Sequence, residues 1–343
     1  MNSEIIKSAY SAGCRLVFTE KSGVAVPEGM LAVKCGGPKS AVHAALGASL
    51  AGSRALALLD EVTAKLPESR VNGGAVIAMP GTGEAFPSLA AAFRASEAAD
   101  RPVVLDSAAV PMSEEDAAVS IKYRKQPERF VGPCERETLC PGCPYRAALY
   151  LASKLWLRTI GDAGCSRLGA KRPFLALDAA WGRGTALAAL SGFLLAMPEA
   201  GRDTIAVIGS GDVDAEGLEL LALSGGTALI VGDGDIAGLC RNLGLETSEL
   251  DAQDVNGLEA ELRRALAADS AEAIICRGKC ALSPDFVRGP AFRTDPNRCR
   301  RCGACGRLGC PAISGRSPVI DASECAGCGL CAKVCKCSAV AEM

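Results

Sequence analysis

The sequence predicts an α/β protein with two successive parallel α/β domains and a small cysteine-rich C-terminal domain of α+β type. Short apolar runs alternate with helical segments over most of the chain, which is typical of parallel sheets covered by helices. A polar, basic segment, Lys122–Arg129, interrupts this alternation and is interpreted as a linker. From about Arg288 the composition changes to Gly, Arg, Pro and Cys, leaving little apolar surface for an independent core. We therefore expect domains at 1–124, 125–290 and 291–343.

Buried strands are expected where three to five mostly apolar residues follow one another, and helices where apolar residues recur with helical spacing. The expected strands are Leu16–Phe18, Ala55–Leu59, Ala75–Met79, Val103–Leu105, Phe174–Leu177, Thr204–Ile208, Ala228–Val231 and Ala273–Ile275. The expected helices are Lys39–Leu50, Phe86–Ala98, Arg146–Leu155, Thr185–Met197, Ala215–Ala222 and Gly257–Ala267.

The charge and hydropathy pattern excludes several classes of protein. A net charge of −2 provides no basic field that would attract nucleic acid or an anionic membrane. The longest apolar stretch, Thr185–Met197, contains Ser191 and Gly192 and is too short to span a bilayer. The first residues include the acidic Glu4 and no apolar segment of the signal-peptide type. We therefore expect a cytoplasmic protein.

Cysteine is strongly over-represented, with 18 Cys against a single histidine, His43. Several of these cysteines stand at the spacings of metal ligands, and thiolates with almost no imidazole favour iron–sulfur clusters or structural zinc. Exposed clusters oxidise easily, so a strongly reducing or anaerobic cell is expected.

Two cysteine runs near the C-terminus have the same spacing. Cys299-Arg-Arg-Cys302-Gly-Ala-Cys305 recurs as Cys325-Ala-Gly-Cys328-Gly-Leu-Cys331, and each triplet is followed by a fourth cysteine, Cys310 or Cys335. In two-cluster ferredoxins the fourth cysteine of each run binds the other cluster. A pair of zinc sites would instead use two pairs of ligands each. We therefore expect two [4Fe–4S] clusters, whose ligands are Cys299, Cys302, Cys305 and Cys335, and Cys325, Cys328, Cys331 and Cys310.

A third group of cysteines lies in the second α/β domain. Cys140-Pro-Gly-Cys143 precedes an expected helix, and Cys165 lies in the glycine-containing turn Gly161-Asp-Ala-Gly-Cys165. Taken alone, the C-x-x-C pair is compatible with a redox dithiol or with half of a zinc site.

These motifs, followed by Ala206-Val-Ile-Gly209 and the cysteine runs, resemble the alpha subunit of indolepyruvate ferredoxin oxidoreductase. More broadly, they resemble the thiamine-dependent 2-oxoacid:ferredoxin oxidoreductases. The resemblance implies a shortened pyrimidine-domain-like part, a pyrophosphate-domain-like part and a ferredoxin domain. It also implies a third [4Fe–4S] cluster on Cys140, Cys143, Cys165 and Cys280, with Cys276 as the competing fourth ligand. The alternative is a set of buried free cysteines, which behave as small apolar side chains.

The thiamine site of that family is altered here. The family's Gly-Asp-Ser motif corresponds to Gly209-Ser210-Gly211, so the carboxylate that holds Mg²⁺ is missing and Asp212 comes two residues late. The family's activating glutamate falls on Pro38, and its histidine after C-P-G-C-P is Tyr145. If thiamine diphosphate with Mg²⁺ binds, Gly209, Ser210, Gly211 and Asp212 are its candidate ligands. A dinucleotide site would need a third glycine at Asp214, and a plain strand-to-helix turn is the simplest interpretation.

Two hypotheses follow for function. In the first, the chain is a redox subunit related to 2-oxoacid:ferredoxin oxidoreductases and relays electrons to ferredoxin or another redox protein. In that family a 2-oxoacid is decarboxylated on thiamine, coenzyme A accepts the acyl group, and a second subunit completes an oligomer. In the second, the chain is a non-catalytic electron-transfer and scaffold subunit that has lost thiamine binding. No role is predicted for Cys14, Cys35, Cys134, Cys240 and Cys337, most of which we expect to be structural.

Overall fold

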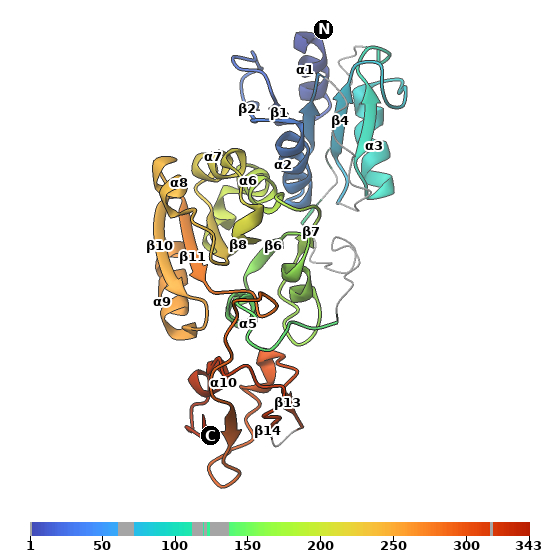
Figure 1. Ribbon diagram of the computed structural model, residues 1–343. Coiled ribbons are helices and arrows are strands. Elements are labelled where there is room, and N and C mark those ends of the chain that lie inside the picture. Colours follow the sequence, from blue (N-terminus) through green and yellow to red (C-terminus); the bar gives the residue numbers. More distant parts are fainter. Residues whose placement is uncertain (1, 61–71, 112–118, 120–121, 124–136, 316–317) are drawn as a thin grey trace. The chain divides into compact units, whose positions relative to one another are not determined.

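The computed structural model describes residues 2–60, 72–111, 119, 122–123, 137–315 and 318–343 (Figure 1). The contacts between residues divide the chain into two compact units. The first unit comprises Met1–Phe130, Gly184–Gly201 and Asp214–Gly226, and the second comprises Val131–Arg183, Arg202–Val213 and Thr227–Met343. The predicted boundary near residue 124, most of the predicted linker and Cys134 lie outside the described residues. The boundary near residue 290 stays a prediction.

A parallel sheet of five strands forms the centre of the first unit, in the order β2-β1-β3-β4-β5. Its central strands are buried on both faces, which explains their continuous apolar sequences. The strands are β1 (Leu16–Thr19), β2 (Leu31–Lys34), β3 (Ala55–Leu58), β4 (Ala75–Met79) and β5 (Val103–Asp106). The helices are α1 (Asn2–Ser11), α2 (Pro38–Leu50), α3 (Leu89–Ala99), α6 (Ala186–Ala196) and α7 (Ala215–Ser224).

Two glycines let helices α2 and α6 approach very closely. A methyl group added at Gly47 of α2 would overlap the carbonyl oxygen of Ala189, and one added at Gly192 of α6 would overlap that of Ala44. The two backbones therefore touch where any larger residue would force them apart. Both helices are almost entirely buried, consistent with their alanine-rich sequences.

The sheet of the second unit has six strands in the order β10-β11-β9-β8-β6-β7, and each of its pairs is parallel. From β6 the chain first adds β7 on one side and then returns to add β8 on the other, so β6 and β8 flank the switch point of the sheet. The strands are β6 (Arg158–Gly161), β7 (Ala179–Ala180), β8 (Thr204–Gly209), β9 (Thr227–Val231), β10 (Glu246–Asp251) and β11 (Glu272–Arg277). The helices are α5 (Tyr145–Lys154), α8 (Ala237–Asn242) and α9 (Val255–Ala267).

Most predicted strands and helices are present within a few residues, and the prediction of parallel α/β sheets is confirmed. The strand predicted at Phe174–Leu177 is wrong. The amide of Phe174 donates to the carbonyl of Lys171 at 3.1 Å, and Leu175 has a φ of +47°, so this apolar segment forms a turn before β7. Turn geometry here overrides the β propensity of the side chains.

The strands that the sequence did not predict include both polar edges. Strand β2 alternates between exposed and buried residues, and β10 consists of the polar sequence Glu-Thr-Ser-Glu-Leu-Asp. On β10, Glu249 forms ion pairs with Arg241 at 2.9 Å and Arg277 at 2.6 Å. An edge strand has a neighbouring strand on one side only, and more of its residues are exposed to solvent. It therefore lacks the continuous apolar run by which central strands are recognised.

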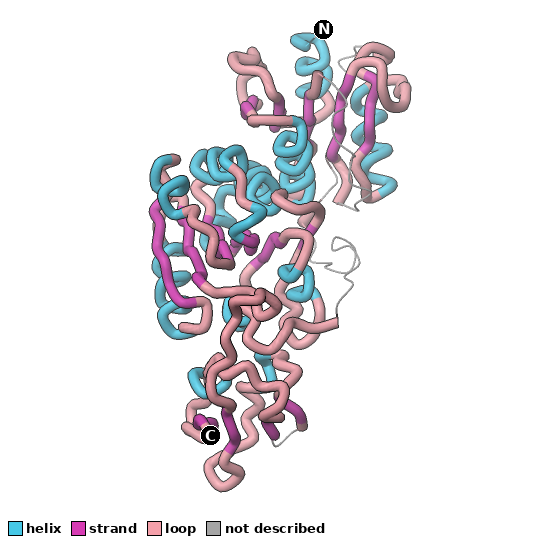
Figure 2. Tube along the Cα trace, viewed as in Figure 1, coloured by secondary structure: helices cyan, strands magenta, loops and turns pink. Residues whose placement is uncertain are grey.

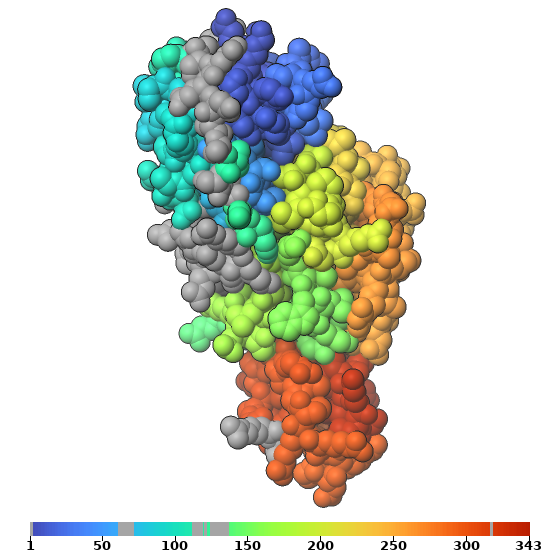
Figure 3. All heavy atoms as spheres, turned by 180° about the vertical axis from the view of Figure 1, so that it is seen from behind, coloured from blue at the N-terminus to red at the C-terminus, as the bar shows by residue number. Residues whose placement is uncertain are grey.

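The C-terminal module, residues 291–343, contains little regular structure (Figure 2). Strand β12 (Phe292–Thr294) pairs antiparallel with β15 (Val340–Glu342) and so joins the start of the module to its end. The rest is the short pair β13 (Ile313–Ser314) and β14 (Val319–Ile320), the single turn α10 (Leu330–Lys333) and loops. The module's atoms, orange to red in Figure 3, pack into one continuous body.

No helix within the described residues is both long and apolar enough to cross a bilayer.

We predict that Gly192→Ala lowers the free energy of unfolding by about 3 kcal/mol, because the added methyl group pushes α2 and α6 apart. Chemical denaturation of the purified chain measures the change. The matched control is Gly201→Ala, where an added methyl group meets nothing within 4 Å. Equal stability of the two variants would contradict the close helix contact.

Candidate metal centres

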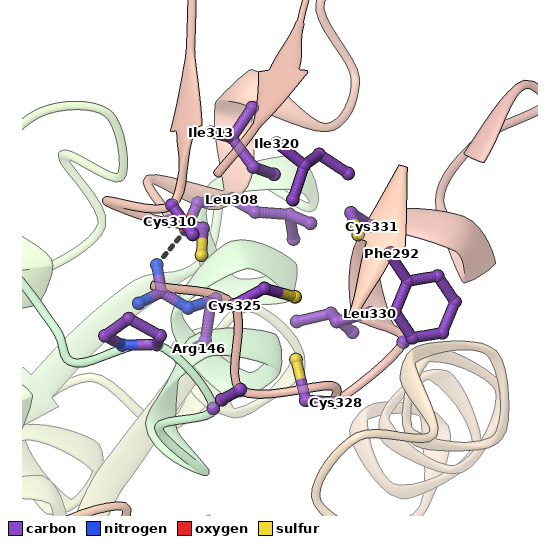
Figure 4. Close-up of a pocket in the computed structure, with 15 residues that line it drawn as sticks. Arg146, Phe292, Leu308, Cys310, Ile313, Ile320, Cys325, Cys328, Leu330 and Cys331 are labelled. Atoms are coloured by element: carbon purple, nitrogen blue, oxygen red, sulfur yellow. Dashed lines mark hydrogen bonds between the residues drawn. The ribbon is translucent and has the colours of Figure 1, made fainter. Parts of the chain in front are cut away.

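Four cysteines line one cavity of the C-terminal module (Figure 4). Cys325, Cys328 and Cys331 come from the second cysteine run, whereas Cys310 is the fourth cysteine of the first run. The cavity holds about 370 Å³ of space that no atom fills, part of it open to solvent, and apolar side chains complete its wall. We call these four residues the Cys310 set. The structure thus brings together the residues that the crossed spacing predicted for one cluster.

A second cavity in the module is lined by the other four predicted ligands, Cys299, Cys302, Cys305 and Cys335, which we call the Cys299 set. It holds about 300 Å³ of space that no atom fills. Cys302 is exposed, whereas Cys305 is buried and lies near the thiols of Cys335 and Cys299. A fifth cysteine, Cys337, also lines this cavity.

Both sets supply the type and number of ligands that a [4Fe–4S] cluster takes. In the part of the chain that the structure describes, no three His, Cys, Asp or Glu side chains converge as the ligands of one ion would. A [4Fe–4S] cluster is held by four cysteine thiolates, one for each iron, so its ligands surround a cavity. Each set supplies four thiols around a cavity, and the residues present therefore fit the cluster.

Burial makes three free thiols of the module, those of Cys331, Cys310 and Cys305, weaker acids. It raises the pKa of the Cys331 thiol to about 12, and the neighbouring thiols of the Cys310 set add to this increase. Burial also raises the pKa of Cys310, although the guanidinium of Arg146 opposes the change, and it raises the pKa of Cys305. Binding of a metal at these sites therefore has to release protons from the thiols.

A buried arginine joins the Cys310 set to the loop that carries Cys140. The side chain of Arg146 is only 1% exposed and lies at the wall of the first cavity. Its guanidinium donates hydrogen bonds to the carbonyls of Leu139 at 2.9 Å and Cys140 at 2.7 Å. It also donates one to the carbonyl of Leu308 at 2.5 Å, drawn as a dashed line in Figure 4. One side chain therefore fixes the end of the first cysteine run against the C-P-G-C loop.

The third group of cysteines is partly assembled. The amide of Cys143 donates to the carbonyl of Cys140 at 3.1 Å, in a turn whose Gly142 has a φ of +76°. The thiols of Cys143 and Cys165 are hydrogen-bonded to each other, and this contact together with burial raises the pKa of Cys143 well above its ordinary value. The structure thus places Cys165 against the C-x-x-C turn, as predicted for a shared site.

The two candidates for the fourth ligand occupy different environments. Cys276 lies on β11, is fully buried and donates to the carbonyl of Ile274, whereas Cys280 is exposed in the turn that follows. The segment between them passes beside the C-P-G-C loop, because a methyl group added at Gly278 would lie 2.9 Å from Pro144. Cys280 stays the predicted ligand, with Cys276 as its alternative.

The glycine turn proposed for thiamine lies at the carboxyl end of β8, beside the switch point of the sheet. Ligands of parallel α/β proteins bind at such points. Gly209 ends the strand, and Ser210, Gly211 and Asp212 form the 3₁₀ helix η3 (Ser210–Asp212). The predicted residues therefore lie at the position where sheets of this topology bind ligands.

The side chains around this turn do not form a Mg²⁺ site. The carboxylate of Asp212 forms an ion pair with Arg183 at 3.1 Å. A methyl group added at Gly209 would lie 2.7 Å from the hydroxyl of Tyr145, so this tyrosine fills the space beside the turn. Pro38 is the first residue of α2, and its ring offers no group that could activate thiamine. The residues present therefore do not fit thiamine diphosphate with Mg²⁺.

Two residues of these sites had no predicted role. Arg146 is the only charge among the apolar residues at the start of α5, and this isolated charge was the available signal. Cys337 follows Cys335 in a C-x-C pattern that the first run lacks.

Comparisons with known proteins identify several relatives by sequence. The chain is 29% identical to the indolepyruvate oxidoreductase subunit IorA of Methanothermobacter marburgensis over 246 aligned residues, 59% of this chain and 39% of the relative. It is 25% identical to the IorA subunit of Pyrococcus horikoshii over 269 residues, 62% of this chain and 41% of the relative. The chain thus spans about two fifths of the length of these curated relatives. No protein-family model matches it.

Solved structures give weaker matches. The 2-oxoglutarate:ferredoxin oxidoreductase from Magnetococcus marinus aligns with a TM-score of 0.36 at 15% identity, over 45% of this chain and 68% of that one. The thiamine diphosphate-dependent 4-hydroxybenzoylformate decarboxylase of Rhodococcus jostii aligns with a TM-score of 0.35 at 14% identity, over 80% of this chain and 64% of that one. Neither match extends to the whole fold. The sequence relatives carry the conclusion: the predicted resemblance of this chain to the indolepyruvate oxidoreductase subunits is confirmed.

Proposed function

We propose that this chain is an iron–sulfur electron-transfer subunit of an oxidoreductase complex related to the 2-oxoacid (indolepyruvate):ferredoxin oxidoreductases. The observation that carries the proposal is the crossed pairing of the two cysteine runs. Each of two cavities is lined by three cysteines of one run and the fourth cysteine of the other. Two-cluster ferredoxins have this arrangement, and [4Fe–4S] clusters, when bound, supply one-electron transfer.

The sequence relatives support the wider context. They are subunits of indolepyruvate oxidoreductases, so a second oxidoreductase subunit is the expected partner of this chain. An oligomeric assembly in the cytoplasm is part of the proposal.

The two cysteine sets have different surroundings, which suggests a direction for electron flow. The Cys310 set adjoins Arg146, and through it the loop of Cys140 and Cys143. The residues between its ligands are small or apolar, as in Cys325-Ala-Gly-Cys328. The Cys299 set contains the exposed Cys302. We infer that electrons enter the module on the side of the Cys310 set and leave on the side of the Cys299 set.

The Cys299 set is flanked by exposed positive charges. Four basic residues stand directly beside its ligands in the sequence and are exposed: Arg298, Arg300, Arg301 and Lys336. Long-range attraction between a basic surface and an acidic partner raises the rate of association. This surface therefore favours an acidic redox protein such as a ferredoxin as the electron acceptor.

We predict that reversing two of these charges, in Arg300→Glu/Arg301→Glu, slows electron transfer to an acidic ferredoxin by about tenfold or more at low salt. Stopped-flow mixing of the dithionite-reduced chain with oxidised ferredoxin measures the rate. Added salt should slow the unmodified chain and narrow the difference, because it screens exposed charges. The control Arg202→Glu reverses the charge of another exposed arginine, outside the module. An equal effect of this control would contradict a specific docking surface.

The third cysteine site predicts a particular iron content. Anaerobically purified chain should contain about twelve Fe, and Cys165→Ala should contain about eight and keep the two ferredoxin-type signals in electron paramagnetic resonance. Cys240→Ala, which removes a buried cysteine of α8 that has no predicted role, is the matched control and should keep the full iron content.

Comparing the iron content of Cys280→Ala with that of Cys276→Ala identifies the fourth ligand of the third site. About eight Fe in the unmodified chain would show that this site is empty.

One observation favours the second hypothesis, a subunit without thiamine chemistry of its own. The only carboxylate within the Gly209–Asp212 turn is paired with Arg183, and Tyr145 fills the space beside Gly209. Mg²⁺ bound to a diphosphate usually keeps one or two protein carboxylates as ligands. In this version of the proposal the chain positions clusters and docks a partner subunit that carries the catalytic site.

We predict that titration of the anaerobic chain with thiamine diphosphate and Mg²⁺ gives no heat of binding and no thermal shift up to millimolar cofactor. The physical reason is the absence of a carboxylate free to bind the metal in the described part of this turn. Saturable binding that Asp212→Asn abolishes would contradict this expectation and favour a catalytic subunit.

A further inference from the structure

The Cys299 set has one cysteine more than a cluster needs. The thiol of Cys337 lies 3.6 Å from that of Cys335, and both residues line the same cavity as Cys299, Cys302 and Cys305. Cys337 is half-buried. The fifth thiol therefore lies at the wall of this cavity, beside the predicted ligand Cys335.

A tight turn brings the two thiols together. The amide of Ser338 donates to the carbonyl of Cys335 at 3.1 Å, and the amide of Ala339 donates to the Cys335 sulfur at 3.3 Å. Ser338 has a φ of +48°, a left-handed conformation that reverses the chain directly after Cys337. Because the turn holds both sulfurs at one wall of the cavity, exchanging one for the other needs only a small movement.

The first cysteine run provides an internal comparison. Its fourth cysteine, Cys310, is followed by Pro311 and Ala312, so no thiol stands two residues further on. Proline fixes the backbone after Cys310, whereas Lys336 leaves the backbone after Cys335 free to adjust. The same module thus contains one fourth ligand without a neighbouring thiol and one with it.

We propose that Cys337 is a second, interchangeable fourth ligand, so that the Cys299 set can hold its cluster through either Cys335 or Cys337. This inference rests on the proposed function, in which the Cys299 set binds a [4Fe–4S] cluster. One thiolate replaces another at the same iron: the entering thiol loses its proton, the leaving thiolate gains one, and no electron is transferred.

Iron analysis and electron paramagnetic resonance of the full chain, purified anaerobically, test the proposal. Cys335→Ala and Cys337→Ala should each keep the iron content of the unmodified chain, whereas Cys335→Ala/Cys337→Ala should lose about one to four Fe, depending on whether a three-iron remnant survives. Cys310→Ala is the matched control, since it removes a fourth ligand that has no neighbour, and should lose as much as the double variant. If Cys335→Ala alone loses as much iron as Cys310→Ala, the proposal is overturned while the proposed function stands.

Alkylation gives a second measurement that does not depend on iron counting. In Cys335→Ala, iodoacetamide should leave Cys337 unlabelled while iron is bound and should label it after a chelator removes the iron, as read by peptide mass spectrometry. Labelling of Cys337 before iron removal would show that water or another group completes the cluster, and would overturn the proposal. An unmodified chain without clusters in this module would overturn both this inference and the proposed function.

Discussion

The hydrogen bonds of one buried guanidinium, that of Arg146, connect the parts of the second unit on which the proposed function depends. Its charge is removed from water and is balanced by three backbone carbonyls, from Leu139, Cys140 and Leu308. A buried charge that loses its partners is strongly destabilising. These hydrogen bonds therefore hold the C-P-G-C loop and the end of the first cysteine run together, because separating them would leave the buried guanidinium without partners. Thiolates of the adjacent Cys310 set, once metal-bound, would add the negative charge that this cation favours.

The sequence allowed the central strands to be predicted because burial on both faces demands an uninterrupted apolar run, as in Ala75–Met79. Elsewhere the same rule predicted one strand that does not form and missed another that does. The turn at Phe174–Leu177 is apolar because Phe174, Ala176 and Leu177 are buried in the core. Strand β10 is polar because it lies at an edge. The helices α6 and α7 group with the first unit, although they lie in the sequence between strands of the second. Such long-range grouping depends on contacts like that of Gly47 with α6, which no local pattern reveals.

For the candidate sites, the spacing of residues along the chain predicted which cysteines of the two runs lie together. It did not predict contacts between residues that are far apart in the sequence. The placement of Cys310 and Cys335 beside the cysteines of the other run could be predicted, since the repeat itself implies it. The positions of Tyr145 and Arg183 at the glycine turn could not, because they depend on how α5 and the loop before α6 approach β8. The loss of the thiamine carboxylate was visible in the sequence, but the pairing of Asp212 was not. The sequence therefore indicated that the family's carboxylate is absent at its expected position, and the structure shows that the next carboxylate, Asp212, is paired with Arg183.

The charged edge strand β10 has a consequence for how larger assemblies can form. An open sheet edge is a template on which another chain can add a strand, and charged side chains along it oppose this addition. Glu249 lies on that edge with its two arginine partners, Arg241 and Arg277, and any incoming strand would have to displace or desolvate these ion pairs. Growth of the six-stranded sheet from one molecule into the next is thereby disfavoured at β10. A partner of the second unit would therefore not be expected to extend the sheet from β10.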